Sequence, residues 1–212
     1  VTPYGVMPED LFRSVVDECI ELNVPVIVLC GFGELFLDKG IRSKLSYLRN
    51  KRPEQKVSLT SNGSLIDRDM ADFLAGCPFL HTIRISVSGF DPQTYKNIMK
   101  LDRDKIYQNV LYLHGALKER GSPTQLRING IYLDEVYREN ELDSYLAFWQ
   151  EHCDVLEVWR PHNWTSAYGY RSKNIAAAES CGRPENGPVE IMWNGNYKLC
   201  CFDFDGKEIL GQ

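Results

Sequence analysis

The sequence predicts an α/β protein built on a parallel sheet. Five short apolar stretches rich in β-branched residues run along the chain, helical patterns separate them, and polar or glycine-containing turns follow several of them. Such regular βα units imply right-handed crossovers. A doubly wound sheet and a barrel, whole or partial, both satisfy this pattern, and the periodicity does not choose between them.

The first helix is expected to begin at Pro8, because a proline there gives up an amide that would have no partner. Glu9 and Asp10 follow in the first turn, where carboxylates interact favourably with the helix dipole. The apolar run 25–30 then predicts the first strand, which ends at Gly31.

The same alternation continues to residue 159. Asp67 has the side chain of a helix N-cap, and Gly76 is expected to end that helix. The remaining predictions are helices around 39–49, 67–74, 106–117 and 142–149, and strands over 56–60, 81–87, 124–131 and 155–159.

Composition excludes several classes of protein. The chain has 212 residues and a net charge of -5, so it has no basic field for nucleic acid. No apolar run approaches the ~20 residues of a membrane span, and no secretory leader opens the sequence. The 7 cysteines are too sparse for a disulfide-stapled scaffold. We therefore expect a cytoplasmic protein without a nucleic-acid or membrane partner.

The first strand is followed by Gly31-Phe32-Gly33-Glu34. Two glycines flanking one residue let the backbone approach a ligand closely. A dinucleotide fingerprint would need a third glycine where Phe36 stands, so that class of site is excluded. A plain strand-to-helix turn remains the alternative.

Polar side chains follow the next strands. Asn62 precedes Gly63, a pair that by itself signals a turn. Ser86 and Ser88 lie two residues apart and are expected on one face, which suggests a polar ligand.

Arg127 and Asn129 share one face of the following strand. A buried guanidinium requires an anion. That anion is either a bound carboxylate or an internal Asp or Glu, and the sequence leaves both open.

Taken in order, Gly31-Phe32-Gly33-Glu34, Thr60-Ser61-Asn62-Gly63 and Ser86-Val87-Ser88-Gly89 resemble the radical S-adenosylmethionine (radical SAM) enzymes across residues 5–165. The resemblance implies a partial (β/α)6 barrel that holds S-adenosylmethionine (SAM) against a [4Fe-4S] cluster. Phe32 replaces the second glycine, and Leu35 the proline, of the family's Gly-Gly-Glu-Pro motif.

The resemblance also implies roles for individual residues in binding SAM. The Gly31–Glu34 motif would bind its amino group, and Asn62 would approach its nucleoside side. The remaining cofactor-binding residues implied are Ser86 and Ser88 near the ribose or carboxylate, Arg127 near the carboxylate, and Asn129.

The C-terminal segment is similar to the opening of a SPASM or twitch domain, which binds auxiliary iron–sulfur clusters. Thirteen residues separate Cys181 from Gly195, and four more precede Cys200. A hairpin turn at residues 194–196 would bring Cys181 and Cys200 to one metal centre. Cys201 is expected to point the other way. A small zinc hairpin or free thiols are the alternatives.

The expected organisation is a barrel over 1–165, a linker over 166–180 and the start of the auxiliary-cluster domain, with a small β-hairpin, over 181–212. The family's Cys-x3-Cys-x2-Cys motif does not occur among the 7 cysteines. We therefore expect the ligands of the [4Fe-4S] cluster to lie upstream of this sequence, and the chain alone to be inactive.

The activity that the resemblance implies is reductive cleavage of SAM, followed by hydrogen abstraction from a peptide or from a sugar or aminocyclitol. A flavodoxin or ferredoxin would donate the electron. His162 follows the last strand and would contact the substrate or relay a proton, although it could equally cap a turn. The alternatives are a cluster-less barrel that acts as a scaffold, and an unrelated βα enzyme with a zinc-binding tail.

Overall fold

The computed structural model describes residues 5–31, 33–161, 187–203 and 206–212. None of the described helices has the length and apolarity needed to cross a membrane. The elements in chain order are α1 (Glu9–Glu21), β1 (Val26–Leu29), the 3-10 helix η1 (Leu35–Leu37), α2 (Ile41–Lys51), β2 (Lys56–Ser61), α3 (Arg68–Ala75), β3 (Leu80–Ser86), α4 (Pro92–Met99), α5 (Arg103–Glu119), β4 (Gln125–Ile131), α6 (Glu141–Gln150), β5 (Val155–Trp159), β6 (Glu190–Ile191), β7 (Tyr197–Lys198) and β8 (Ile209–Gly211).

The chain divides into two compact units, one of which is Asp17–Arg160 and the other Val1–Val16 together with Pro161–Gln212. The larger unit contains a parallel sheet with the strand order β1-β2-β3-β4-β5. Every crossover therefore advances in the same direction, whereas a doubly wound sheet reverses direction. The strand order settles the choice that the sequence pattern leaves open, in favour of winding of the barrel type.

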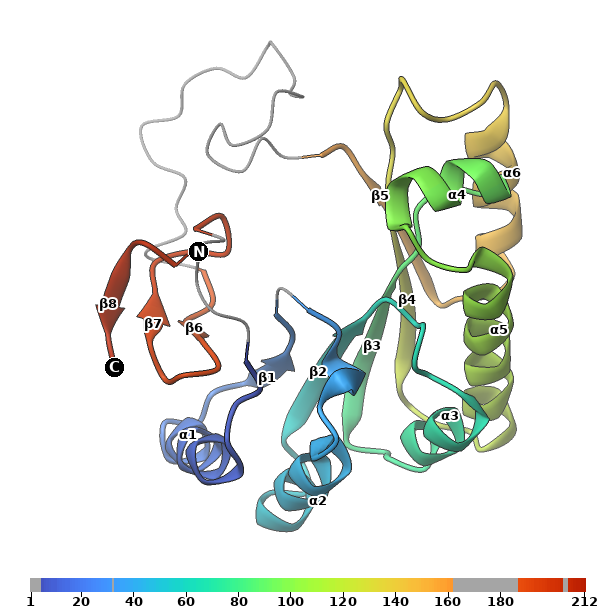
Figure 1. The fold of residues 1–212 in the computed structure, drawn as a ribbon. Helices are drawn as coiled ribbons and strands as arrows, with labels where there is room; N and C mark the ends of the chain where they lie inside the picture. Colours follow the sequence, from blue (N-terminus) through green and yellow to red (C-terminus); the bar gives the residue numbers. More distant parts are fainter. Residues whose placement is uncertain (1–4, 32, 162–186, 204–205) are drawn as a thin grey trace. The chain divides into compact units, whose positions relative to one another are not determined.

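Right-handed crossovers that all advance one way place their helices on a single face of the sheet. Figure 1 shows α2, α3, α5 and α6 along one side of the strands. The strand side chains on that face are apolar, and Leu59, Ile85 and Ile128 have no exposed surface. The helices thus cover the apolar face, and the polar strand residues occupy the opposite one.

The sequence places the strands and most helices within a few residues of their observed bounds. Asp67 is confirmed as an N-cap, because its side chain accepts a hydrogen bond from the amide of Met70. The sequence patterns do not predict helix α4, although Asp91 caps it and Pro92 occupies its first turn. The predicted hairpin is confirmed by the antiparallel pair β6–β7, and β8 adds a third strand that the pattern does not predict.

We predict that Gly63→Ala lowers the free energy of unfolding by about 2 kcal/mol. Gly63 has a φ of +78°, and a Cβ there would lie 3.2 Å from Ile85 Cγ2 and 3.3 Å from Ile106 Cγ2. Urea unfolding measures the change. Gly115→Ala in α5 is the control: its new Cβ would meet nothing within 4 Å, and it should stabilise the helix by up to about 1 kcal/mol. Equal effects of the two substitutions would contradict the prediction.

We also predict that His114 makes stability fall as the pH drops. Burial lowers the pKa of His114, and nearby Lys118 and His152 lower it further, while Asp154 opposes them. The unfolded chain therefore binds more protons here than the folded one, and the free energy of unfolding decreases as the pH falls through about 6.5. His114→Gln should flatten this dependence in denaturant titrations between about pH 7.5 and 5. Asn50→Gln, at an exposed position without a titratable group, is the control and should keep the wild-type slope.

Candidate functional site

The polar face of the sheet gathers polar side chains toward the carboxyl ends of four strands. Thr60, Arg84 and Arg127 are partners across β2, β3 and β4. One pleat closer to the strand ends, Ser86 and Asn129 are partners, and Glu157 on β5 completes the row. Residues in register on parallel strands point to the same side, so these two rows form one polar surface.

The row nearer the strand ends, Ser86, Asn129 and Glu157, is held together by Glu157. The sequence pattern does not identify Glu157 as a site residue. Its Oε2 accepts a hydrogen bond from Asn129 Nδ2 at 2.8 Å, and its Oε1 lies 3.4 Å from Arg127 Nη1. Arg127 Nε also donates to Gln125 Oε1 at 2.8 Å. Of the two partners that the sequence leaves open for Arg127, the structure therefore provides the internal carboxylate.

Two polar atoms on this surface lack a hydrogen-bond partner in the described part of the chain. They are Asn129 Oδ1 and Arg84 Nε, and both atoms are buried. Asn129 as a whole is only 8% exposed. Arg84 is not predicted as a site residue, although it precedes Ser86 by two positions just as Arg127 precedes Asn129. That repeated spacing is the signal that could have identified it.

Glu34 fastens the loop after β1 to the carboxyl end of β2. Its Oε1 accepts hydrogen bonds from Ser61 Oγ at 2.7 Å and from the Phe36 amide at 3.2 Å. Its Oε2 accepts from the Asn62 amide at 2.7 Å. Of the residues predicted to bind a ligand, Glu34 and Asn62 are thus brought together, and the Glu34 carboxylate holds the loop in place.

The glycines of this loop leave their backbone accessible. Gly31 and Gly33 are exposed, and a Cβ at either position would meet no atom within 4 Å. Phe32 between them lies outside the described residues. Asn62 turns the next loop, since its Oδ1 accepts a hydrogen bond from the Ser64 amide at 2.9 Å. The turn expected from Asn-Gly therefore forms, with the loop beside Glu34.

Ser86 and Ser88 differ in their surroundings. Ser86 ends β3 and is half-buried on the polar face. Ser88 lies beyond the strand and is 2% exposed, and its Oγ accepts a hydrogen bond from the Ile131 amide at 2.9 Å. Ser88 therefore joins the ends of β3 and β4, whereas Ser86 faces the polar surface.

Three tyrosines fix the carboxyl ends of β3 and β4. The hydroxyl of Tyr145 donates to the Val87 carbonyl at 2.8 Å, and that of Tyr107 donates to the Gly89 carbonyl at 3.0 Å. The hydroxyl of Tyr137 accepts a hydrogen bond from the Gly89 amide at 2.8 Å and donates one to the Ile131 carbonyl at 3.1 Å. Burial raises the pKa of Tyr107 to about 12 and also raises the pKa of Tyr137 and Tyr145, so all three remain protonated donors.

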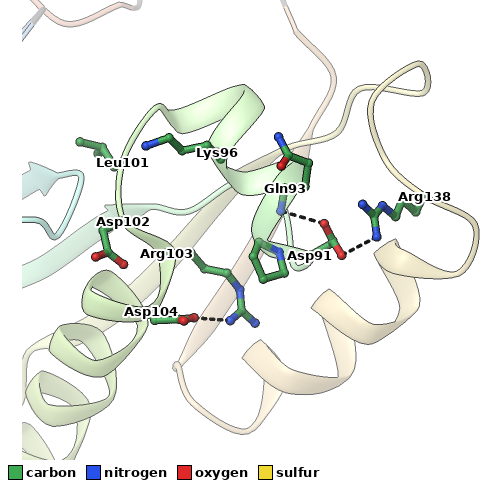
Figure 2. Close-up of a pocket in the computed structure, with 9 residues that line it drawn as sticks. Asp91, Gln93, Lys96, Leu101, Asp102, Arg103, Asp104 and Arg138 are labelled. Carbon is green, nitrogen blue, oxygen red and sulfur yellow. Dashed lines mark hydrogen bonds and ion pairs between the residues drawn. The ribbon is translucent and has the colours of Figure 1, made fainter.

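A pocket of about 520 Å³ lies beside α4 and the start of α5, on the helix layer (Figure 2). Its charged groups are largely paired: Arg138 Nη1 lies 2.8 Å from Asp91 Oδ2, and Arg103 Nη1 lies 2.6 Å from Asp104 Oδ1. None of the predicted site residues lines this pocket. We therefore do not assign the site to it.

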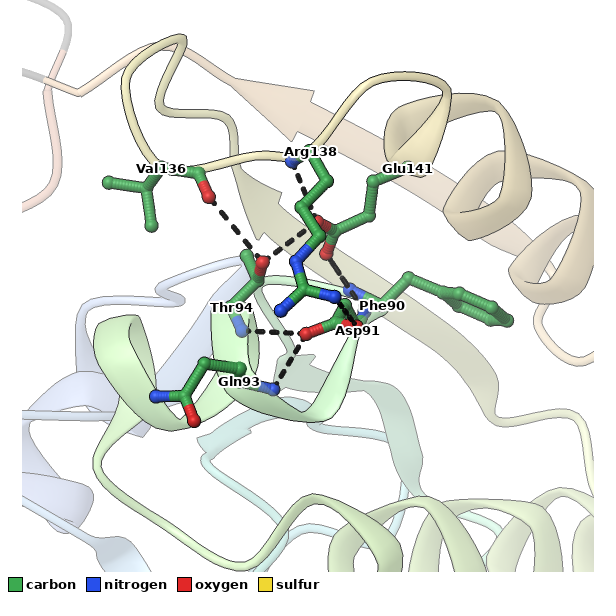
Figure 3. Close-up of polar contacts among 7 residues, drawn as sticks. All are labelled: Phe90, Asp91, Gln93, Thr94, Val136, Arg138 and Glu141. Carbon is green, nitrogen blue, oxygen red and sulfur yellow. Dashed lines mark hydrogen bonds and ion pairs between the residues drawn. The ribbon is translucent and has the colours of Figure 1, made fainter.

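Glu141 organises the loops next to this pocket (Figure 3). It is 5% exposed, and its Oε1 accepts hydrogen bonds from the amides of Phe90 and Asp91 at 2.7 and 2.9 Å. Its Oε2 accepts from Thr94 Oγ1 at 2.8 Å and from the Arg138 amide at 3.0 Å. This carboxylate fixes the loop after β3 to the loop before α6.

Three predicted site residues remain, and they belong to the C-terminal part of the chain. His162 and Cys181 lie outside the described residues. Cys200 is half-buried in the smaller unit, and its Sγ lies 3.5 Å from the Phe202 amide. Its role as a metal ligand stays a prediction.

Residues 2–144 of the chain match the sequence model of the Radical SAM superfamily. No curated protein matches the chain. Among solved structures, native anSMEcpe with bound AdoMet has a TM-score of 0.68 at 17% identity, covering 100% of this chain and 70% of that one. Streptococcus suis SuiB bound to precursor peptide SuiA has a TM-score of 0.66 at 17% identity. The chain is 99% covered there but spans 56% of SuiB. These similarities confirm the predicted partial-barrel fold.

We predict that Glu34→Ala loosens the loop that ends β2. The substitution removes the acceptor of three hydrogen bonds, so the free energy of unfolding should fall by about 2 kcal/mol. Hydrogen exchange at the Asn62 amide should accelerate more than exchange at the amides within β2. Glu119→Ala, at an exposed position on α5, is the control and should leave this exchange unchanged. Unchanged exchange at Asn62 in Glu34→Ala would show that Glu34 does not hold the loop.

Proposed function

The chain belongs to the radical SAM superfamily, and on that premise we propose that it acts in an enzyme that cleaves SAM reductively and abstracts a hydrogen atom from its substrate. The observation that carries the proposal is the meeting of the exposed Gly31 and Gly33 backbone, the Asn62 turn and the polar rows at the carboxyl ends of adjacent parallel strands. Active sites of barrel enzymes lie at this edge.

We propose that this edge binds SAM. The residues fit the ligand, because the accessible backbone at Gly31 and Gly33 offers carbonyl acceptors for its amino group. Arg127 offers a guanidinium for its carboxylate. Asn62 would approach the nucleoside, and Ser86 the ribose or carboxylate. Asn129 Oδ1 has no hydrogen-bond donor in the described part of the chain, so it could accept a hydrogen bond from the ligand. Ser88 is occupied by the Ile131 amide, so in this proposal it positions β4 instead of contacting the ligand.

When bound, the [4Fe-4S] cluster of such an enzyme supplies the electron that cleaves SAM to methionine and a 5′-deoxyadenosyl radical. The 7 cysteines of this sequence lack the Cys-x3-Cys-x2-Cys spacing, so the residues present do not fit that cluster. We therefore assign its ligands to residues beyond these 212 and derive no step through them. What this chain contributes is the binding and orientation of SAM on the polar face.

We further propose a peptide substrate, with a sugar or aminocyclitol as the alternative. The structure of SuiB with its precursor peptide supports the peptide. Cys181 and Cys200 would ligate an auxiliary iron–sulfur cluster in a domain that begins near residue 181. His162 would contact the substrate or relay a proton, and a flavodoxin or ferredoxin would donate the electron. The family assignment removes the unrelated βα enzyme from the alternatives.

The complete protein that contains this chain should produce 5′-deoxyadenosine from SAM. It would be purified anaerobically, reconstituted with iron and sulfide, reduced with dithionite and assayed by chromatography. The 212-residue chain alone should give no product. Arg127→Gln should raise the KM for SAM about tenfold, because it removes a charge-assisted hydrogen bond. The control is Arg49→Gln, an exposed position on α2, which should match the wild type.

Two results would contradict the proposal. A complete protein that binds no iron would exclude the radical mechanism. An iron-loaded protein that yields no 5′-deoxyadenosine, with and without peptide substrates, would contradict the proposed cleavage of SAM. A complete protein that binds no iron would favour the cluster-less scaffold. That alternative would be supported if the complete protein also lacked the three-cysteine spacing, which is absent from these 212 residues.

A further inference from the structure

Two arginines lie side by side in the row of the polar face that is farther from the strand ends, the row of Thr60, Arg84 and Arg127. Arg84 on β3 is the direct register partner of Arg127 on β4. Adjacent strands are only about 4.8 Å apart. Like charges in directly opposite positions of a sheet destabilise it, so this arrangement needs a compensating anion.

The two guanidinium groups are unequally compensated. Arg127 has Glu157 and Gln125 as partners, and Glu157 also accepts a hydrogen bond from Asn129. Arg84 makes no hydrogen bond or ion pair with any residue that the structure describes, and its Nε is buried. The surface therefore carries two positive charges against one negative charge, and the uncompensated charge belongs to Arg84.

Burying part of a charged group without a partner is costly. A ligand carboxylate would remove that cost, since guanidinium N–H groups match carboxylate oxygens in a two-pronged geometry. Asn129 adds a second indication, because it is 8% exposed and its Oδ1 lacks a donor in the described chain. A ligand with a carboxylate and a nearby N–H or O–H group would satisfy both residues.

We propose that Arg84, together with Arg127, binds the carboxylate of a ligand on the polar face, and that Arg84 provides the uncompensated charge. This inference rests on the proposed function only for the identity of the ligand. The carboxylate belongs either to SAM itself or to an acidic substrate. Both share the same chemistry, and the experiment separates them.

The first measurement is stability without ligand. Arg84→Gln should leave the melting temperature of the complete protein unchanged or raise it, because it removes one of two adjacent like charges. A guanidinium with a structural partner would behave in the opposite way, and a marked loss of stability would overturn the proposal. Arg49→Gln controls for the general loss of a positive charge at an exposed site.

The second measurement is calorimetric titration of the complete, anaerobically reconstituted protein with three probes: SAM, its decarboxylated analogue, and glutarate. If SAM supplies the carboxylate, Arg84→Gln should weaken the binding of SAM at least tenfold and leave the affinity for the decarboxylated analogue unchanged. If an acidic substrate supplies the carboxylate, the substitution should leave the affinity for SAM unchanged and weaken the binding of glutarate. Arg84→Lys keeps the positive charge but lacks the two-pronged guanidinium geometry. Its affinity for the carboxylate ligand should lie between those of the wild type and Arg84→Gln.

Either pattern supports a carboxylate site and identifies its ligand. If Arg84→Gln alters the affinity for none of the three probes, or weakens the decarboxylated analogue as much as SAM, the proposal is wrong. Binding does not require cleavage of SAM. A protein that forms no 5′-deoxyadenosine yet shows one of these patterns would refute the proposed function alone.

Discussion

The larger unit depends on one constraint: its parallel sheet has an apolar face, covered by helices, and an opposite polar face. Because every crossover advances in the same direction, the helices gather on one face. Apolar residues such as Leu59 and Ile128 are buried there. The intervening residues of the same strands must then face the other side. A period of two along each strand thus separates the core from the polar surface, and one set of strands carries both.

Two carboxylates, the half-buried Glu34 and the buried Glu141, hold the loops at the edge of this surface. Glu34 accepts three hydrogen bonds and Glu141 accepts four, and most of the donors are backbone amides. Loops usually leave such amides to water. Here the carboxylates satisfy them, which fixes the loops after β1 and β3 without extra secondary structure. The backbone at Gly31 and Gly33 can therefore remain exposed on an anchored loop.

Local patterns in the sequence predict the parts of the fold that local physics decides. Asp67 is a recognisable N-cap, and the alternation around Arg127 and Asn129 correctly places both residues on one face. Helix α4 is missed because its eight residues offer too few apolar positions for a clear helical period, although Asp91-Pro92 marks its start.

Strand order and register decide what the sequence cannot show. The order of the strands separates a barrel from a doubly wound sheet, and it depends on the direction of each crossover. The pairing of Glu157 with Asn129, and of Arg84 with Arg127, depends on the register between strands that are distant in sequence. A single residue of slip would turn each of these side chains to the other face.

The same register dictates where a bound carboxylate would lie. Glu157 on β5 repels an anion, Arg84 on β3 attracts it, and Arg127 lies on β4 between them. A ligand carboxylate is therefore most favourable above β3 and β4, on the side away from Glu157. Arg127 can offer Nη2 to the ligand there, because its Nε donates to Gln125 and its Nη1 lies against Glu157. Its internal ion pair is thus compatible with ligand binding, because the pair holds Arg127 in place and leaves Arg84 to supply the charge.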